Sequence, residues 1–349
     1  MGNITFDLKI PYSLLLHRKT PPPGWGRLGE GGLFTLPFIP SHRGKGNTVT
    51  TLQHVAERCS QLMVFTFFIL LVSGCDLMGK DTSMQKSDKP YPSKLDQPRA
   101  LQYIFHPRQE IAANPPAGAV DYAIRVDEGV TIGCRFYIAD INAPSILFFH
   151  GNGEIVGDYD DIGPVYNRYG LNLLAVDYRG YGTSGGTPTV TTMLKDSHAI
   201  FKEVRQWLKK KNMHGPLWIM GRSLGSASAL ELASQYETDS AGLIIESGFA
   251  YTVPLLDFLG VNTKALGITE ADCFRHIEKI KTVRKPTLII HAQYDQFIPV
   301  SDAEAFLKHS SATKKALRII PGADHNTILL IAGRSYFETI KQFITAKGV

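Results

Sequence analysis

The pattern with the clearest chemical meaning in this sequence is a serine at a sharp turn. A short apolar run, 217–220, leads into Gly-Arg-Ser-Leu-Gly at 221–225, and a run with helical periodicity follows. A strand, a tight turn and a helix in this order hold the serine hydroxyl beyond the end of a sheet, at a helix N-terminus. Glycines two residues before and after the serine let strand and helix approach closely. Ser223 is therefore the candidate nucleophile.

A serine hydroxyl is a weak nucleophile, so it needs a histidine base that a carboxylate orients. His325 lies in the segment Pro-Gly-Ala-Asp-His-Asn at 321–326, after the last expected strand. Asp295 follows the penultimate expected strand. The chain order Ser223, Asp295, His325 is the one expected for a catalytic triad in a mostly parallel sheet of this type.

Other residues compete for the roles of acid and base. Glu246 also ends an expected strand and is the alternative acid. Asp324 adjoins the candidate base but would point away along the chain. His291 lies inside its strand and is expected to be a core histidine or to support the site. His150 is expected to organise the turn after its strand rather than to transfer protons.

The negative charge that develops on the substrate carbonyl needs two backbone donors. The N–H of Leu224, next after the nucleophile, is the first. The second is expected from the His-Gly-Asn-Gly loop at 150–153, where Asn152 is best placed and glycines allow close approach. Loss of one such donor lowers kcat by about 10²–10³, so this loop matters nearly as much as the triad.

Short apolar runs that alternate with helical patterns predict an α/β fold with a mostly parallel sheet and helices on both faces. Sites in such sheets lie beyond the carboxyl ends of the strands, where these motifs fall. An apolar cluster without a strand predicts a short cap at about 249–283, and a helix on the sheet edge is the alternative. The expected strands are 120–126, 131–139, 145–149, 171–176, 217–220, 243–246, 286–291 and 317–321, and the expected helices are 192–210, 302–309 and 327–345.

Composition excludes several classes of function. Residues 1–74 hold 7 Lys/Arg against 3 Asp/Glu, and the remainder holds 30 against 29, so no nucleic-acid partner is expected. The cysteines lack metal-type spacing, so neither a metal nor an organic cofactor is implied. Cys134 and Cys273 are expected to be buried free thiols, with a disulfide between them as the alternative. The chain's cysteines are Cys59, Cys75, Cys134 and Cys273.

The segment 51–75 has the features of a secretory signal. Arg58 precedes an apolar run at 62–72, and Ser-Gly-Cys follows at 73–75. The end of this segment resembles the lipobox of bacterial lipoproteins, which implies acylation of Cys75. An uncleaved membrane anchor is the alternative, although only 17 uncharged residues separate Arg58 from Asp76.

The segments beside this signal complete the predicted organisation. Residues 1–50 are irregular, and we hypothesise that they are not translated because such signals normally begin a chain. Residues 76–100 are polar and predict a flexible tether to a hydrolase domain at 101–349. The expected location is the bacterial cell envelope, with the protein anchored in a membrane through lipidated Cys75 and facing the periplasm or the exterior. Asp76 resembles an inner-membrane retention signal.

Taken together, residues 101–345 resemble the α/β-hydrolase superfamily. The branch is the one labelled serine aminopeptidase-like or lysophospholipase-like, which includes eukaryotic depalmitoylases. The resemblance implies a nucleophile, acid and base at Ser223, Asp295 and His325, and an oxyanion hole formed by Asn152 and Leu224. The motifs that carry it are HGNG (150–153), DYRGYGTSGG (177–186), GRSLGS (221–226), YDQFIP (294–299) and GADH (322–325).

The expected function is a serine hydrolase that cleaves small carboxylic esters or thioesters through an acyl-enzyme. An apolar cap would favour acyl substrates. Because the same triad cleaves amides, a serine peptidase is one alternative. A binding protein that kept the fold and lost the chemistry is another.

Overall fold

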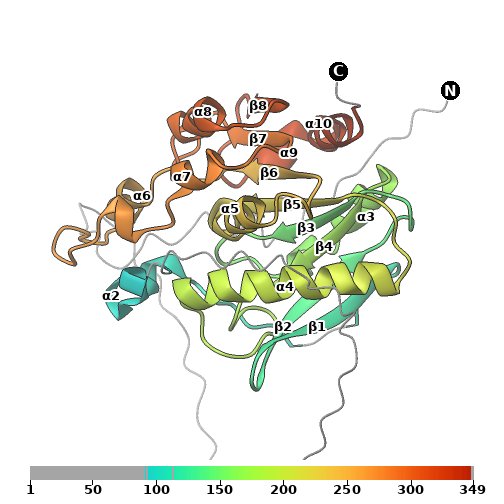
Figure 1. The fold of residues 1–349 in the computed structure, drawn as a ribbon, viewed down its shortest axis with the longest axis horizontal. Helices are drawn as coiled ribbons and strands as arrows, with labels where there is room; N and C mark the ends of the chain where they lie inside the picture. The colour runs from blue at the N-terminus through green and yellow to red at the C-terminus, as the bar shows by residue number, and fades with distance from the viewer. Residues whose placement is uncertain (1–90, 92, 112–113, 347–349) are drawn as a thin grey trace, which may run out of the picture. The chain divides into compact units, whose positions relative to one another are not determined.

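Eight strands form a single sheet with helices on both faces in the computed structural model, which describes residues 91, 93–111 and 114–346 (Figure 1). The strand order is β1-β2-β4-β3-β5-β6-β7-β8. β1, β2 and β4 pair antiparallel, and every other neighbouring pair is parallel. This confirms the predicted α/β fold. The strands are β1 (Ala119–Asp127), β2 (Val130–Tyr137), β3 (Ser145–Phe149), β4 (Asn172–Val176), β5 (Leu217–Arg222), β6 (Gly242–Glu246), β7 (Thr287–Ala292) and β8 (Lys315–Ile320).

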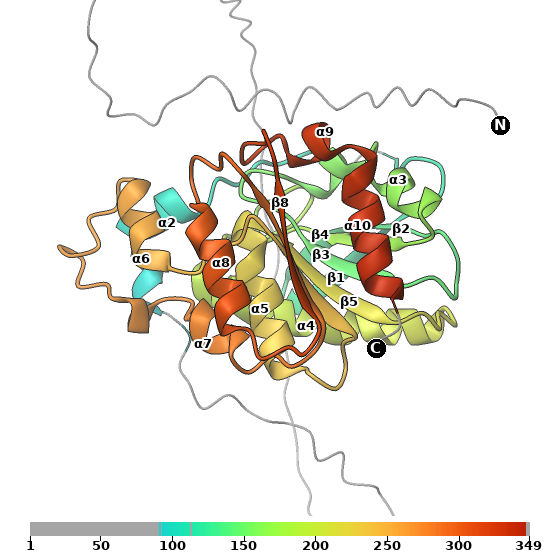
Figure 2. The same cartoon turned by 90° about the horizontal axis from the view of Figure 1, so that it is seen from above.

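The sheet separates two apolar cores. Every residue of β3, β4, β5, β6 and β7 is buried, as expected for parallel strands covered on both faces. The helices that cover the sheet are α3 (Gly163–Arg168), α4 (Val190–Lys210), α5 (Ser226–Gln235), α7 (His276–Ile280), α8 (Val300–His309), α9 (Ile328–Ala332) and α10 (Arg334–Thr345). One core contains side chains of α4, α5, α7 and α8, and the other contains those of α3, α9 and α10. The two groups of helices lie on opposite sides of the sheet (Figure 2).

The segment predicted as a cap contains only short helices. They are α6 (Thr252–Phe258), η5 (Glu270–Asp272) and α7 (His276–Ile280). α7 packs on the sheet-covering helices α5 and α8, whereas α6 contacts α2 (Pro98–Ile104), a helix that precedes the first strand. α2 and α6 lie side by side in both views (Figures 1 and 2). The first half of the segment therefore borders α2, and its second half packs on helices that cover the sheet rather than on the sheet edge.

The sequence patterns missed some features of the body. One helix was expected over 327–345, but Gly333 adopts φ 50° and separates α9 from α10. α3 was not predicted, because it has too few residues for a clear periodicity. It starts at Gly163, where an added Cβ would lie 2.2 Å from the Tyr137 ring. Cys134 and Cys273 are buried free thiols, so the alternative disulfide is not formed.

The folded body begins before residue 101. The prediction of a flexible tether is wrong for 93–100, since η2 (Ser93–Asp96) and the start of α2 occupy these residues. Leu95 and Ala100 are fully buried there. Two isolated apolar side chains in a polar stretch produce no periodic signal, but they belong to the core of the domain. The predicted signal at 51–75 with Cys75, the segment 1–50 and tether residues 76–90 lie outside the described residues.

Among the helices that the structure describes, none combines the length and the apolar character needed to cross a membrane.

Candidate active site

Ser223 occupies a strained turn between β5 and α5. It begins η4 (Ser223–Gly225) with φ 50°, a left-handed conformation that is uncommon for residues other than glycine. A Cβ at Gly221 would lie 2.3 Å from the carbonyl oxygen of Gly225. A Cβ at Gly225 would lie 2.0 Å from the carbonyl oxygen of Phe149. Only glycine fits at either position, and the close packing holds the serine at the edge of the sheet.

The structure brings the three predicted triad residues together. His325 lies in the turn after β8, and its Nε2 is 3.0 Å from Ser223 Oγ. Its Nδ1 donates to Asp295 Oδ2 over 2.7 Å, and Asp295 lies in the loop after β7. With the proton on Nδ1, the lone pair of Nε2 faces the serine hydroxyl. The arrangement suits proton transfer from serine to histidine.

Asp295 is held as a buried carboxylate. Its side chain has no exposed surface, and its Oδ1 accepts the backbone N–H groups of Phe297 at 3.1 Å and Ile298 at 2.9 Å. Burial alone would raise its pKa, but the hydrogen bond and charge of His325, together with the backbone donor Ile298, lower the pKa below its usual value. A carboxylate in this state stabilises a protonated His325.

The other acidic candidates make different contacts. Glu246 ends β6 and pairs with Arg222 and Tyr336 rather than with the histidine. Asp324 accepts hydrogen bonds from the N–H of Asn326 at 3.0 Å and the hydroxyl of Thr327 at 2.8 Å. It therefore closes its own turn. Among the described residues, Asp295 is the carboxylate hydrogen-bonded to the imidazole of the candidate base.

Two further histidines support loops around the site. His291 Nε2 donates to the carbonyl of Ile298 over 2.9 Å, and burial lowers the pKa of His291, which keeps it neutral. His150 donates from Nδ1 to Gly151 at 2.8 Å and from Nε2 to Asp177 at 3.1 Å. Burial opposes the charge on His150, but Asp177 outweighs it and raises the pKa. His150 therefore orders its loop through contacts of both ring nitrogens.

The candidate oxyanion donors border the same cavity as Ser223 and the candidate base. The Asn152 side chain is fully engaged elsewhere: Oδ1 accepts from the N–H of His106 at 2.9 Å and from the Tyr181 hydroxyl at 2.7 Å. The backbone N–H of Asn152 has no acceptor among the described residues. The N–H of Leu224 lies in the first turn of η4, where backbone donors have no partner within the helix. Both are suited to bind an oxyanion.

A largely apolar cavity of about 280 Å³ opens beside Ser223. The predicted cap supplies one side, from α6 and the residues around it. The other side comes from α2, through Tyr103 and Ile104, whose role no sequence pattern indicates. Its apolar lining is Tyr103, Ile104, Leu224, Phe249, Leu255, Leu256, Leu259, Phe274, Phe297 and Ile298.

A buried ion network lies beneath the site, and it was not predicted from the sequence. Arg222, the residue before the nucleophile, pairs with Glu154 and with Glu246, the latter over 3.1 Å. Its Nη2 donates to the carbonyl of His325 over 2.9 Å. Glu154 in turn accepts the N–H of Gly151 at 2.8 Å. One guanidinium therefore joins the loop of the base to the candidate oxyanion loop.

The charges of this network follow from its geometry. Burial would raise the pKa of Glu154, but Arg222 and His150 lower it below its usual value. Burial dominates at Glu246 and raises its pKa, although Arg222 opposes the shift. The sequence contained one indication of this network, because Arg222 and Glu246 end otherwise apolar strands. Charged residues in such positions must find partners when they are buried. The sequence could not identify those partners.

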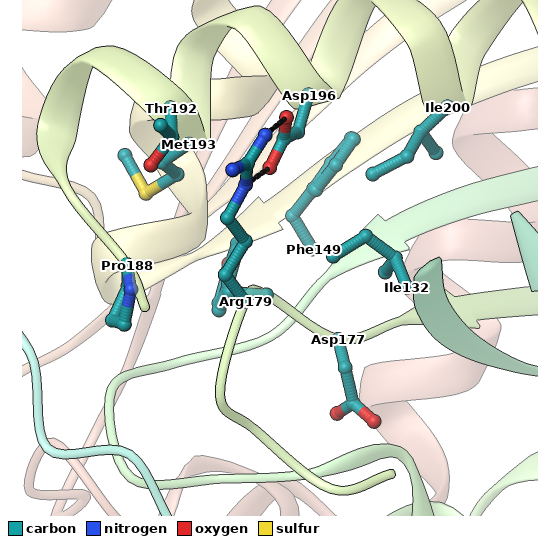
Figure 3. A pocket seen from close by; sticks show the side chains of 10 residues that line it. Ile132, Phe149, Asp177, Arg179, Pro188, Thr192, Met193, Asp196 and Ile200 are labelled. Atoms are coloured by element: carbon teal, nitrogen blue, oxygen red, sulfur yellow. Dashed lines mark hydrogen bonds and ion pairs between the residues drawn. The ribbon is translucent and has the colours of Figure 1, made fainter. Parts of the chain in front are cut away.

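A second, much smaller pocket lies under α4 and has a volume of about 10 Å³ (Figure 3). Arg179 borders it and makes two hydrogen bonds to Asp196 of α4, at 2.7 and 2.8 Å (Figure 3). This pair attaches the loop after β4 to the helix. A space of this size holds one water molecule at most. The cavity beside Ser223 borders both the candidate nucleophile and the candidate base, and it is therefore the candidate substrate site.

Comparisons with known proteins agree with this architecture. Residues 142–269 match the family described as serine aminopeptidase, S33. The human alpha/beta hydrolase domain-containing protein 17B is 31% identical over 238 residues, which cover 65% of this chain and 76% of that protein. An uncharacterized protein of Mycobacterium tuberculosis is 26% identical over 299 residues, covering 84% of this chain and 98% of that one. An esterase of Pyrococcus furiosus shares the fold with a TM-score of 0.56 and 17% identity, over 68% of this chain and 97% of the esterase.

Proposed function

Since this chain belongs to the α/β-hydrolase superfamily, we propose that it is a serine hydrolase that cleaves carboxylic esters or thioesters through an acyl-enzyme. The observation that carries this proposal is the hydrogen-bonded series from Asp295 through His325 to Ser223, with distances of 2.7 and 3.0 Å. The three side chains meet at the carboxyl ends of β5, β7 and β8. This is the position in which such sheets carry their chemistry.

The proposed reaction has two halves. Ser223 Oγ attacks the carbonyl carbon while His325 Nε2 takes its proton, and the oxyanion receives the N–H groups of Leu224 and Asn152. The protonated histidine then donates to the leaving alcohol or thiol, which leaves an acyl-serine. Water attacks this ester with His325 as base, and the acid product departs. Asp295 remains a carboxylate and stabilises the imidazolium in both halves.

The lining of the cavity supports an acyl substrate. Leu255, Leu256 and Leu259 approach from the α6 side, and Tyr103 and Ile104 approach from α2. Apolar carbon placed in this space leaves water, which contributes about 25 cal/mol per Å² of buried apolar surface. A substrate with an apolar acyl chain gains binding energy here, and a charged group at the same position would lose its hydration.

A serine aminopeptidase is the second candidate, because the matched family carries that description. Recognition of a free amino terminus needs an anion near the scissile bond. Glu154 is the carboxylate among the described residues that line the cavity. It is paired with Arg222 and accepts hydrogen bonds from Gly151 and Tyr159. An ammonium ion would compete with that network, which favours an ester or thioester over an aminopeptide.

Membrane attachment belongs to the same proposal. We propose that a lipid on Cys75 anchors the protein in the bacterial cell envelope, on the periplasmic or exterior side. The lipobox-like end of the apolar segment 62–72 supports this location. Mass analysis of the protein from membranes tests it: a mature N-terminus at an acylated Cys75 is expected, and an unmodified cysteine in an uncleaved chain would refute it.

Fluorophosphonate labelling of the full-length protein tests the activity. The parent is expected to be labelled and to hydrolyse p-nitrophenyl butyrate, and Ser223→Ala should lose both. Ser234→Ala is the matched control, because Ser234 lies on α5 and its hydroxyl donates to a helix carbonyl. A folded parent that is neither labelled nor active would favour a binding protein with a hydrolase fold. Faster hydrolysis of an aminoacyl arylamide than of the ester would favour the peptidase.

A further inference from the structure

A short segment ahead of the first strand contacts the oxyanion loop. The loop consists of residues 150–154, between β3 and η3 (Val156–Tyr159). Residues 106–108 follow α2 and precede β1, so they lie outside the span 142–269 that matches the family. His106 also borders the cavity of the site. The segment is therefore close enough to the chemistry to influence it.

His106 fixes the orientation of the Asn152 side chain. Its backbone N–H donates to Asn152 Oδ1 over 2.9 Å, which identifies that atom as the oxygen of the amide. The amide nitrogen of Asn152 then donates to His106 Nδ1 over 2.8 Å. Tyr181 adds a third hydrogen bond, to Oδ1, over 2.7 Å. These contacts use complementary donors and acceptors, so the amide cannot rotate without losing them.

Arg108 holds the other end of the same loop. Its Nε donates to the carbonyl of Gly153 over 3.2 Å, and its Nη2 pairs with Asp158. The backbone of Arg108 is itself fixed, because its carbonyl accepts the N–H of Gly182 over 2.8 Å. Gly153 has φ 77°, a conformation that glycine adopts freely and that the loop must maintain by external contacts.

We propose that residues 106–108 are a positioning segment that aims the backbone N–H of Asn152 at the oxyanion. This inference rests on the proposed hydrolase function. The N–H and the side chain of Asn152 are attached to the same Cα, so holding the amide in place restricts the direction of the N–H. Without these contacts the donor remains in the chain but is less well aligned when the charge develops.

The alternative roles of His106 predict different kinetics. A residue that binds substrate changes KM, whereas a residue that aligns an oxyanion donor changes kcat with KM retained. A residue needed only for folding lowers stability and leaves the kinetics of the folded protein unchanged. His106 and Arg108 are exposed, so their replacement should not prevent folding.

The test compares His106→Ala, Asn152→Ala and the double variant, with Gln102→Ala as matched control. Gln102 is exposed on α2, and its side chain bonds within that helix. With p-nitrophenyl butyrate, His106→Ala should lower kcat about tenfold with KM within twofold, well below the loss of a whole donor. Asn152→Ala retains the backbone N–H of residue 152, and kcat should fall about as much as in His106→Ala. The double variant should be no worse than the worse single variant, because both remove one interaction.

Hydrogen exchange provides a readout that does not depend on turnover. The N–H groups of Glu154 and Ile155 are bonded within the loop region, at 3.3 and 3.1 Å. Both should exchange faster in His106→Ala and in Arg108→Ala than in the parent or in Gln102→Ala. If the parent has no hydrolase activity but the exchange changes as expected, the proposed function fails and the positioning contact stands.

Several results would overturn the inference in an active parent. The first is a kcat of His106→Ala equal to that of the parent, and the second is a change in KM alone. The third is a fall in kcat of the double variant that equals the product of the two single effects. Unchanged exchange of the loop in both the His106 and Arg108 variants would overturn it whatever the activity.

Discussion

Replacement of Arg222 by methionine tests the buried network directly. The side chains of Arg222 and Glu154 are each 8% exposed, and that of Glu246 is 3% exposed. Methionine fills much of the same volume but leaves two buried carboxylates without their cation. Breaking a buried pair in this way costs about 3–5 kcal/mol. At about 2–4 °C per kcal/mol for a domain of this size, Tm should fall by roughly 6–20 °C.

The loss should depend on pH with a defined sign. Burial already raises the pKa of Glu246 in the parent, and removal of Arg222 raises it further. The same change raises the pKa of Glu154, which Arg222 lowers in the parent. An acid whose folded pKa lies above its unfolded pKa destabilises the protein at higher pH. The penalty disappears as the pH falls and the carboxyl is protonated in both states. The difference in Tm between parent and variant should therefore be larger at pH 8 than at pH 5.5.

Thermal unfolding followed by circular dichroism at pH 5.5, 7 and 8 measures the effect. The matched control is Arg205→Met, which removes an exposed pair with Asp239 at 2.8 Å and should change stability by less than about 1 kcal/mol. A second variant, Arg222→Met with Glu246→Gln, removes one unpaired charge and should recover part of the loss. An Arg222→Met protein that melts within 2 °C of the parent at pH 8, or whose deficit grows on acidification, would refute the reasoning.

Three further predictions follow from the site. Asp295→Asn should lower kcat on p-nitrophenyl butyrate by about 10⁴, because the amide cannot hold His325 in the required tautomer; a loss under tenfold would contradict this role. Gly225→Ala should lower the free energy of unfolding by at least about 1–3 kcal/mol, because the new Cβ would meet the carbonyl of Phe149 at 2.0 Å; chemical denaturation measures this, and parental stability would count against it. Leu256→Trp fills the cavity and should lower kcat/KM for p-nitrophenyl octanoate about tenfold relative to the acetate, whereas an unchanged ratio would place the acyl chain elsewhere.

The triad and the turn at Ser223 were accessible from the sequence for a physical reason. Residues that follow parallel strands meet at one edge of the sheet, so Asp295 and His325 were expected to be close although they are 30 residues apart. The glycines around Ser223 indicated a tight turn, although the sequence does not show which atoms they pack against.

The boundaries of the folded domain and the contacts that support the site were harder to predict from the sequence. The pairing of Arg222 with Glu154 joins residues 68 positions apart, and no local pattern specifies which strand ends become neighbours. The contact of His106 with Asn152 spans 46 positions and depends on where α2 packs. Leu95 was assigned to a tether, because isolated apolar residues in a polar stretch give no periodic signal.

The sequence by itself determined the eight strands and their alternation with helical segments, the α/β class and the identity of the candidate nucleophile, acid and base. These follow from apolar periodicity and from residue types that local geometry demands. Only the tertiary structure decided that Arg222 joins the loops of the site, that α2 completes the cavity and that His106 anchors Asn152. Such contacts form when segments distant along the chain pack together, and their free energy depends on burial and on the direction of each donor and acceptor.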